Sequence, residues 1–243
     1  MTPEISVIIT AFNRKEFLER AINSAIGQSF PDQRYEIIIV TNFTPSVDPA
    51  VLNKFKGEIK YIRFTTEQIS EMLLLGIKNS RGNIICFLDD DDLFTEEKLQ
   101  RVYEVFTNHP DLVYYHNNYL RFRDCGNLQK GLFWTNKSLY IPKKEMKVRK
   151  IREVIRKGGN FNLSCISVKR SQLGTISNKD WNFNYLPDSM LFYFMLGRGD
   201  FIVDSTVLTH YHSHKSVSNQ GIDSIVKKTI EATQQMCDAI QGP

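Results

Sequence analysis

The sequence has few of the features that mark several common classes of protein. Its four cysteines never occur at CxxC spacing, which argues against a zinc site built on them. Scattered single cysteines suit a reducing compartment. No apolar run approaches the ~20 residues that a membrane helix needs, and residues 1–5 lack the pattern of a signal peptide. We therefore expect a cytoplasmic domain, with the cytoplasmic face of a membrane as the alternative location.

An excess of one charge and a glycine-rich loop are also missing. Lys and Arg number 31 against 27 Asp and Glu, and this near balance does not predict a nucleic-acid partner. No Gly-x-Gly-x-x-Gly pattern follows the first apolar run, residues 6–12, so a Rossmann dehydrogenase is not expected. Residues 10–16 contain no glycine, which counts against a nucleotidyltransferase, since that chemistry usually uses a glycine-rich phosphate loop after the first strand.

Alternating strands and helices dominate the first half of the chain. Residues 6–12 and 35–41 are continuous apolar runs, typical of strands that are buried on both faces of a parallel sheet. Asn13 and Glu16 have the spacing of a capping box and predict a helix after the first strand. Thr95, before two glutamates, predicts the start of another helix. Further strands are expected at 59–64, 83–88 and 112–115, and a helix at 67–79.

This alternation predicts an α/β fold, with a doubly wound, mostly parallel sheet flanked by helices. In such sheets ligands bind outside the carboxyl ends of the strands. Phe12, Thr41 and residues 89–92 all lie at the carboxyl ends of predicted strands, so we expect them to meet in one cleft.

The second half of the chain is less regular. Strands are expected at 164–168 and 201–211, a helix from Pro187, and a C-terminal helix at 222–240. We expect one domain over residues 1–243, with halves at 1–120 and 121–220 followed by the segment 221–243. Residues 143–157 form a basic stretch with apolar residues at helical spacing. It fits either an anionic membrane surface or an ordinary solvated helix face.

Two groups of polar residues could bind a metal. Four adjacent carboxylates, Asp89 to Asp92, repel one another unless water or a cation neutralises them. Oxygen ligands suit Mg²⁺ or Mn²⁺, although an acidic loop before a helix N-terminus has the same composition. His210, His212 and His214 would share one face of a strand, either as metal ligands or as a structural face.

Five segments together resemble a known family. They are 6–14 (SVIITAFNR), 75–82 (LGIKNSRG), 85–92 (ICFLDDDD), 186–191 (LPDSML) and 212–218 (HSHKSVS). In this order and spacing they resemble the family 2 glycosyltransferases of the GT-A fold. The resemblance implies transfer of a sugar from a nucleoside-diphosphate sugar to a glycan or lipid-linked hydroxyl acceptor, by a single displacement with inversion.

The resemblance also implies roles for particular residues. Phe12 would pack on the nucleobase, Arg81 would contact the donor phosphates or base edges, and Asp188 would be the general base. Asp91 would ligate Mn²⁺ or Mg²⁺, joined by His214. The remaining nucleotide-sugar contacts would come from Thr10, Ala11, Arg14, Asn42, Asp89 and Asp90.

The sequence departs from the family pattern at several positions. Thr41-Asn42 stands where the family usually has an aspartate pair, although the Asn42 amide can still accept from a base N–H. Residues 72–75 are apolar where the family usually has an asparagine, and the acidic pair before the late helix is reduced to Pro187-Asp188. An inactive relative that keeps the fold therefore remains an alternative.

Overall fold

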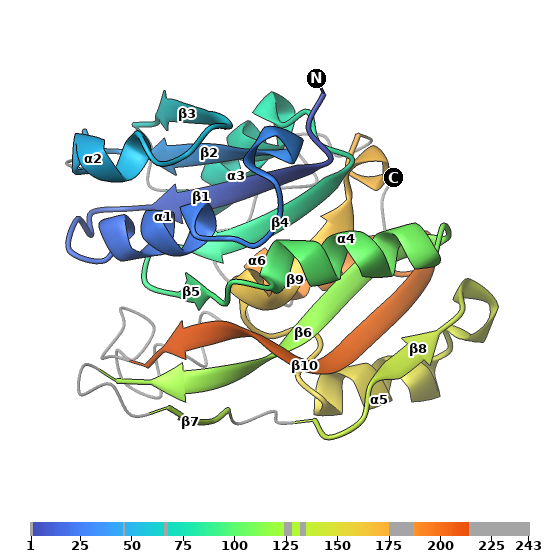
Figure 1. Ribbon diagram of the computed structural model, residues 1–243. Helices are drawn as coiled ribbons and strands as arrows, with labels where there is room; N and C mark the ends of the chain where they lie inside the picture. The colour runs from blue at the N-terminus through green and yellow to red at the C-terminus, as the bar shows by residue number, and fades with distance from the viewer. Residues whose placement is uncertain are drawn as a thin grey trace.

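The computed structural model describes residues 2–45, 47–65, 68–123, 128–131, 135–174 and 187–213. Within these ranges ten strands form one mixed sheet, with the order β3-β2-β1-β4-β9-β6-β10-β5 (Figure 1). β7 (Gln129–Lys130) pairs with β6 and β8 (Leu139–Ile141) pairs with β10. The predicted C-terminal helix at 222–240 lies outside the described residues. No helix in the described ranges has the length and apolar character needed to cross a membrane.

The first four strands are parallel, as the sequence predicts. They are β1 (Ile5–Ala11), β2 (Tyr35–Thr41), β3 (Glu58–Arg63) and β4 (Ile84–Asp89). Every residue of β1 and β2 is buried, because both strands lie inside the sheet and helices cover both faces. β3, at the edge, is exposed or half-buried along its length.

Helices cover the two faces of the sheet in separate groups. On one face α1 (Leu18–Ile26) and α4 (Lys98–Asn108) pack against the same core cluster, and both lie in front of the sheet in Figure 1. The opposite face is covered by α3 (Ile69–Asn79), α5 (Val148–Arg156) and α6 (Pro187–Met195). A short helix, α2 (Pro49–Leu52), precedes β3.

The second half of the chain continues the same sheet and adds antiparallel strands. β9 (Ile166–Lys169) lies between β4 and β6 (Leu112–Phe122) and is antiparallel to both. β6 pairs in parallel with β10 (Asp200–His212), and β5 (Leu93–Phe94) closes the far edge. Since β6 runs past residue 120, the two expected halves build one sheet.

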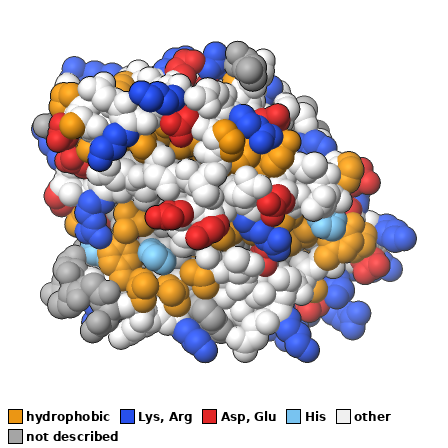
Figure 2. Space-filling model, in the orientation of Figure 1, with side chains coloured by type: hydrophobic (Ala, Val, Ile, Leu, Met, Phe, Trp, Pro, Cys, Tyr) orange, Lys and Arg blue, Asp and Glu red, His pale blue; other side chains and the backbone are white. Residues whose placement is uncertain are grey.

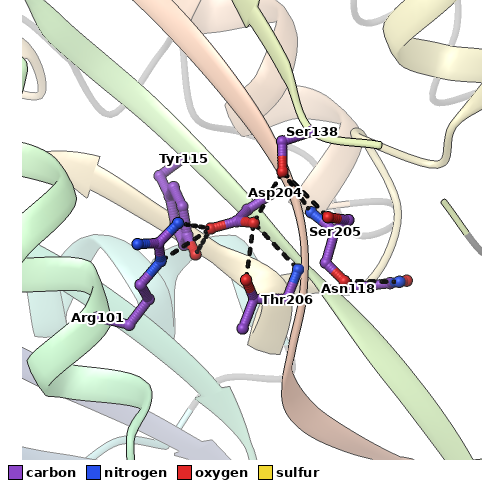
Figure 3. Close-up of polar contacts among 7 residues, drawn as sticks. All are labelled: Arg101, Tyr115, Asn118, Ser138, Asp204, Ser205 and Thr206. Atoms are coloured by element: carbon purple, nitrogen blue, oxygen red, sulfur yellow. Dashed lines mark hydrogen bonds and ion pairs between the residues drawn. The ribbon is translucent and has the colours of Figure 1, made fainter. Parts of the chain in front are cut away.

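A buried carboxylate holds an irregular segment of β10 in place. The register between β6 and β10 shifts between Val203 and Val207, and Asp204 lies in this bulge, 2% exposed. Its Oδ2 accepts two hydrogen bonds from Arg101 and one from the Tyr115 hydroxyl. Figure 3 shows how these side chains, with those of Thr206 and Ser138, converge on the carboxylate. The pairing that the bulge breaks is therefore replaced by side-chain hydrogen bonds.

Two predicted helix starts are wrong. α1 begins at Leu18, five residues after Asn13, and Phe17 precedes it without a side-chain cap. Asn13 instead has a left-handed backbone, with φ of 57°. α4 begins at Lys98, three residues after Thr95, again without a side-chain cap. In both places a turn from the sheet edge delays the helix, so the polar residue that looks like a cap belongs to the turn.

Candidate active site

The carboxyl ends of three neighbouring strands bring the predicted residues together. Ala11 at the end of β1 pairs with Thr41 at the end of β2, and Thr10 pairs with Asp89 at the end of β4. Phe12 follows β1 and is half-buried. The expected convergence of these segments on one edge of the sheet is therefore observed.

A pair of asparagines connects the first two strand ends. The Asn13 backbone N–H donates to Asn42 Oδ1 at 3.0 Å, and Asn42 Nδ2 donates to Asn13 Oδ1 at 2.6 Å. The left-handed backbone of Asn13, a conformation that asparagine tolerates better than most residues, makes this exchange possible. The position at which the family resemblance implies an aspartate thus carries an amide that fixes the loop after β1.

The acidic segment, residues 89–92, contains carboxylates of very different exposure. Asp90 and Asp92 are each 1% exposed, whereas Asp91 is half-buried. Burial raises the pKa of Asp90 to about 7, although the Arg14 guanidinium opposes this shift. Burial and the charge of Asp91 raise the pKa of Asp92 to about 7 as well. The segment therefore lacks sufficient positive charge of its own, and a cation would favour its ionised form.

Arg14 supplies part of that charge. Its guanidinium forms an ion pair with Asp90 and another with Asp91, the latter at 2.7 Å. One oxygen of Asp90, Oδ2, is buried and accepts no hydrogen bond from the described residues. Arg14, expected to contact the donor, thus lies against the acidic segment at the same sheet edge.

The oxygen ligands of this segment fit a hard divalent cation. Mg²⁺ is commonly bound by one or two carboxylates together with substrate phosphates. Asp91 is half-buried and Asp90 has a carboxylate oxygen to spare, so both could contribute. Across the described ranges, however, no group of three or more His, Cys, Asp and Glu side chains could hold a metal. His214, the other predicted ligand, lies outside these ranges, so the metal site stays a prediction.

The candidate base, Asp188, lies in the first turn of α6. Its Oδ2 accepts the Asn162 backbone N–H at 2.9 Å and its Oδ1 accepts the Ser189 N–H at 2.8 Å. Burial raises the pKa of Asp188 to about 6, against the effect of these hydrogen bonds. A carboxyl with this pKa is mostly ionised at neutral pH and more basic than a solvated aspartate, which suits a general base.

Three hydrogen bonds connect Asp188 to the acidic segment through residues 162–164. Beyond Asn162, the Ser164 backbone N–H donates to Asn162 Oδ1 at 2.8 Å. The Ser164 hydroxyl in turn accepts the Asp89 backbone N–H at 3.0 Å. The candidate base and the acidic segment are therefore linked through the same short stretch of chain. Neither Asn162 nor Ser164 was identified from the sequence, where an asparagine in GGNFNLS indicates only a turn.

Among the predicted site residues that the structure describes, Arg81 is the one placed elsewhere. It precedes β4, so it lies at the amino edge of the sheet, opposite to Asp89. There its Nε donates to Glu36 Oε2 at 2.9 Å, and a terminal nitrogen pairs with Glu58 at 2.5 Å. Arg81 thus lies apart from Thr10 and Asp89, with which it was expected to contact the donor, at its phosphates or base edges. Its guanidinium instead links the amino ends of β2 and β3.

The alternating histidines have different surroundings. His212 is 2% exposed and its ring stacks on Phe122 and meets the edge of Phe17. Its backbone N–H donates to Asp92 Oδ1 at 2.9 Å, so the end of β10 supports the acidic segment. His210 is half-buried at the pairing of β10 with β5. These contacts give His212 a packing role.

Comparison with known proteins gives a consistent result. The family model described as "Glycosyl transferase family 2" matches residues 6–168. A poly(ribitol-phosphate) beta-N-acetylglucosaminyltransferase, TarP of Staphylococcus aureus, is 30% identical over 45% of this chain and 35% of its own length. An uncharacterized glycosyltransferase of Rickettsia conorii is 32% identical over 55% of this chain and 22% of its own. The matched segment thus spans a minor part of each of these relatives.

Solved structures match over nearly the whole chain. Residues 1–349 of S. aureus TarS in complex with UDP-GlcNAc align with a TM-score of 0.67 at 13% identity, covering 94% of this chain and 66% of that one. The same protein in complex with UDP aligns with a TM-score of 0.65. At this identity the likeness shows the fold, a mostly parallel GT-A sheet flanked by helices. The fold, the motifs and the family match agree, and the chain belongs to glycosyl transferase family 2.

Proposed function

We propose that this chain transfers a sugar from a nucleoside-diphosphate sugar to a hydroxyl group, with inversion and with Mn²⁺ or Mg²⁺. The observation that carries the proposal is the connection of two kinds of carboxyl group at one sheet edge. The acidic segment has more carboxylates than the Arg14 guanidinium can neutralise. Asp188, three hydrogen bonds away through Asn162 and Ser164, has the surroundings of a general base. UDP and UDP-GlcNAc are bound in solved structures of TarS, which shares this fold.

The donor would lie along the carboxyl ends of β1, β2 and β4. Phe12 would pack against the nucleobase, and the Asn42 amide would replace the usual aspartate as its hydrogen-bond partner. The backbone of Thr10 and Ala11 would border the ribose, near Asp89. Arg14, already beside Asp90 and Asp91, is close enough to these carboxylates to meet the diphosphate.

A divalent metal held by Asp91, with His214, would neutralise the diphosphate as it leaves. The residues of the chain would do the rest. Asp188 would accept the proton of the acceptor hydroxyl while that oxygen bonds to the anomeric carbon and the bond to the phosphate oxygen breaks. Since the nucleophile attacks opposite to the leaving group in one step, the configuration of the sugar carbon inverts. Asp90, buried against Arg14, would hold the acidic segment in shape.

The basic segment, residues 143–157, supports a location at an anionic membrane that carries a lipid-linked acceptor. It contains eight Lys and Arg against two Glu, and its apolar side, with Val154 at its centre, is packed in the core. Six of its cations are exposed, and none of the six pairs with a carboxylate of the described residues. They are Lys143, Lys144, Lys147, Arg149, Arg152 and Arg156.

Figure 2 shows Lys and Arg side chains along the lower right of the molecule, where α5 and β8 lie in Figure 1. Val148, 64% exposed, stands among these cations. Electrostatic attraction of about 1 kcal/mol for each cation near the surface would hold the protein on anionic lipid. Co-sedimentation with anionic and neutral vesicles tests this location, and equal binding to both would contradict it.

An inactive, nucleotide-binding relative is the second candidate. Two observations favour it: Arg14 already occupies Asp90 and Asp91, and the Asn42 amide is already bound to Asn13. A protein of this kind would bind a nucleotide without turnover. A nucleotidyltransferase has no comparable support, because no glycine follows β1 before residue 27.

Thermal stability against a panel of nucleoside diphosphates, with and without Mn²⁺, tests the donor site. A ligand that binds only the folded state at 100 times its Kd stabilises by about 2.7 kcal/mol. We expect one nucleotide to raise Tm only with metal, and Asp91→Ala to abolish the increase. Asp111→Ala, an exposed aspartate at the amino edge of the sheet, serves as the control.

Turnover of the matching sugar nucleotide then separates the enzyme from the inactive relative. Asp188→Asn should keep the metal-dependent Tm shift and lose transfer. Failure of every nucleotide to shift the wild type under any metal condition would contradict the donor site. Nucleotide binding without turnover of any sugar nucleotide would favour the inactive relative.

A further inference from the structure

The stretch of chain from Gly159 to Cys165, called the strap here, lies between α6 and the acidic segment. It enters from α5 and ends in a short 3-10 turn, Leu163–Cys165, which leads into β9. Asn162, at its centre, is 6% exposed and has a left-handed backbone with φ of 64°. A buried residue other than glycine in this conformation is uncommon, and such residues are retained where the surroundings require them.

On one side the strap is attached to the start of α6. The Asn162 backbone N–H donates to Asp188 Oδ2 at 2.9 Å. Two residues earlier, the Asn160 amide donates to the Ser189 hydroxyl, which in turn donates to the Asn160 carbonyl, both at 3.2 Å. The strap and the first turn of α6 are therefore joined at two neighbouring points, one of which is the carboxylate of Asp188.

On the other side the strap is attached to the acidic segment. The Ser164 hydroxyl accepts the Asp89 backbone N–H at 3.0 Å. The Asn162 side chain also accepts the Ser164 N–H at 2.8 Å, which fixes the 3-10 turn. The Ser164 carbonyl oxygen accepts a hydrogen bond from the buried Lys98 Nζ at 3.2 Å.

The backbone and the side chain of Asn162 make different contacts. The left-handed backbone points the N–H toward α6, whereas the side chain secures the turn that reaches the acidic segment. Glycine would adopt the same backbone without strain but would lose the side-chain contact. Alanine would lose the side chain and also disfavour the left-handed conformation. Asparagine is the residue that provides both.

We propose that Asn162 is a positioning residue that sets the orientation of Asp188 relative to the acidic segment. The role of Asp188 as the base rests on the proposed function, but the physical coupling between the two residues does not. It can therefore be tested without a substrate. Burial and the charge of Asp188 raise the pKa of the Tyr114 hydroxyl of β6, which donates to the Gly159 carbonyl of the strap at 2.7 Å.

The first measurement is the titration of the Asp188 carboxyl carbon by NMR in the protein without ligands, assigned by comparison with Asp188→Asn. An N–H donated to a carboxylate favours the ionised form. Asn162→Ala should relax the left-handed backbone, weaken this bond and raise the titration midpoint by about 0.5 pH unit or more. Asn162→Gly keeps the backbone and should titrate as the wild type does. An unchanged midpoint in a folded Asn162→Ala would overturn the proposal, whatever its effect on Tm.

The second measurement is transfer kinetics, once a donor has been identified. Asn162→Ala should lower kcat about tenfold or more with the donor KM unchanged, because the base is misaligned while the nucleotide still binds. Asn162→Gly should lower kcat less than Asn162→Ala, because it loses only the contact to Ser164. This variant keeps the proposal testable if Asn162→Ala does not fold, since wild-type kcat in Asn162→Gly would remove the role of the side chain. A protein without turnover that still shows the NMR difference would refute the proposed function and leave the coupling intact.

Discussion

Arg14 and Arg81 have contrasting surroundings although both were expected to contact the donor. Arg14 lies at the carboxyl edge of the sheet, 33% exposed, beside the fully buried carboxylate of Asp90. Arg81 lies at the amino edge, 51% exposed, between Glu36 and Glu58. Only the first of these arginines can influence a cation or a phosphate bound at the acidic segment.

Replacement of Arg14 should therefore change the response to metal. Arg14→Ala leaves Asp90 buried without its partner, so we expect it to lower the free energy of unfolding by about 1–2 kcal/mol without metal. Mn²⁺ should then stabilise Arg14→Ala more than it stabilises the wild type, because the carboxylates no longer share a guanidinium.

Thermal melts with EDTA and with a series of Mn²⁺ concentrations measure this difference. Arg81→Ala is the matched control and should respond to Mn²⁺ as the wild type does. An equal increase in Tm for Arg14→Ala and the wild type would show that Arg14 and the metal do not compete.

The place of single residues at the sheet edges could largely be predicted from the order of elements. Thr10, Ala11 and Asp89 follow or end buried strands, and parallel strands bring such residues together. The same reasoning excludes Arg81 from the site, since it precedes the strand that ends at Asp89. The family resemblance suggests a donor contact for Arg81, whereas its place before β4 puts it at the opposite edge of the sheet. Asn162 could not be found in this way, because its importance depends on contacts with residues distant in the chain.

The predicted helix starts failed for a different reason. Asn13 and Thr95 have the composition of caps, but each lies in a turn that leaves the sheet edge before the helix begins. At Asn13 the partner that decides the conformation is Asn42, which is 29 residues away. A capping pattern describes a local hydrogen bond between a side chain and a backbone N–H group. It does not predict a cap where the side chain is hydrogen-bonded to a distant residue.

The bulge of β10 should depend strongly on Asp204. Burial alone would raise the pKa of this carboxyl, but hydrogen bonds from Thr206, Arg101 and Tyr115 outweigh it and lower the pKa. Removing the carboxylate leaves several of these donors buried without an acceptor. We expect Asp204→Ala to lower the free energy of unfolding at pH 7 by about 3 kcal/mol.

The pH dependence of this difference is a stricter test. Because the folded-state pKa lies below the unfolded value, the contribution of Asp204 is complete above about pH 4 and is lost as pH falls through the folded-state pKa. Urea titrations of wild type and Asp204→Ala at pH 7, 4 and 3 should show the difference shrinking only at the lowest pH. Asp111→Ala is the control, and a difference that does not vary with pH would assign the loss to packing alone.

Strands could be predicted in both halves of the chain, but their pairing in the sheet only in the first half. Continuous apolar runs such as 35–41 identify strands buried on both faces, and these strands are parallel as expected. β9 has only four residues and is inserted antiparallel between β4 and β6. Its place is decided by pairing with strands 81 and 52 residues away, as in the pairs Cys86 with Ser167 and Tyr115 with Ser167. No local pattern carries that information.

The junction of β6, β9 and the strap contains a histidine that should affect the acid stability of the entire fold. His116 is 3% exposed, and its Nε2 lies 2.8 Å from the Phe161 carbonyl oxygen, to which it donates. Burial, together with the smaller effect of the Lys98 charge, lowers the pKa of His116 to about 4 against the opposing hydrogen bond to Phe161. In the unfolded chain His116 has an ordinary pKa near 6.5. The unfolded chain therefore binds a proton at pH values where the folded protein does not.

The difference between the folded and unfolded pKa of His116 decides how stability changes with pH. Below pH 6.5 the unfolded state gains a proton first, so the contribution of His116 to stability is complete above about pH 6.5 and falls as pH drops toward 4. Between pH 7 and pH 4 the wild type should lose about 3 kcal/mol relative to His116→Gln, which keeps an N–H donor and cannot be protonated. The buried carboxyl groups affect both proteins equally, so the comparison cancels their contribution.

Urea titrations of both proteins at several values between pH 7 and pH 4 measure this difference, with His109→Gln as a control for the loss of an imidazole outside the core. We expect His116→Gln to be less stable than the wild type, or equal to it, at pH 7 and to gain on it steadily below pH 6.5. A constant difference across the range would mean that His116 is protonated equally in both states. A protonated His116 would then be stable beside the Phe161 carbonyl of the strap. The junction would be more accessible to water than the burial of His116 indicates.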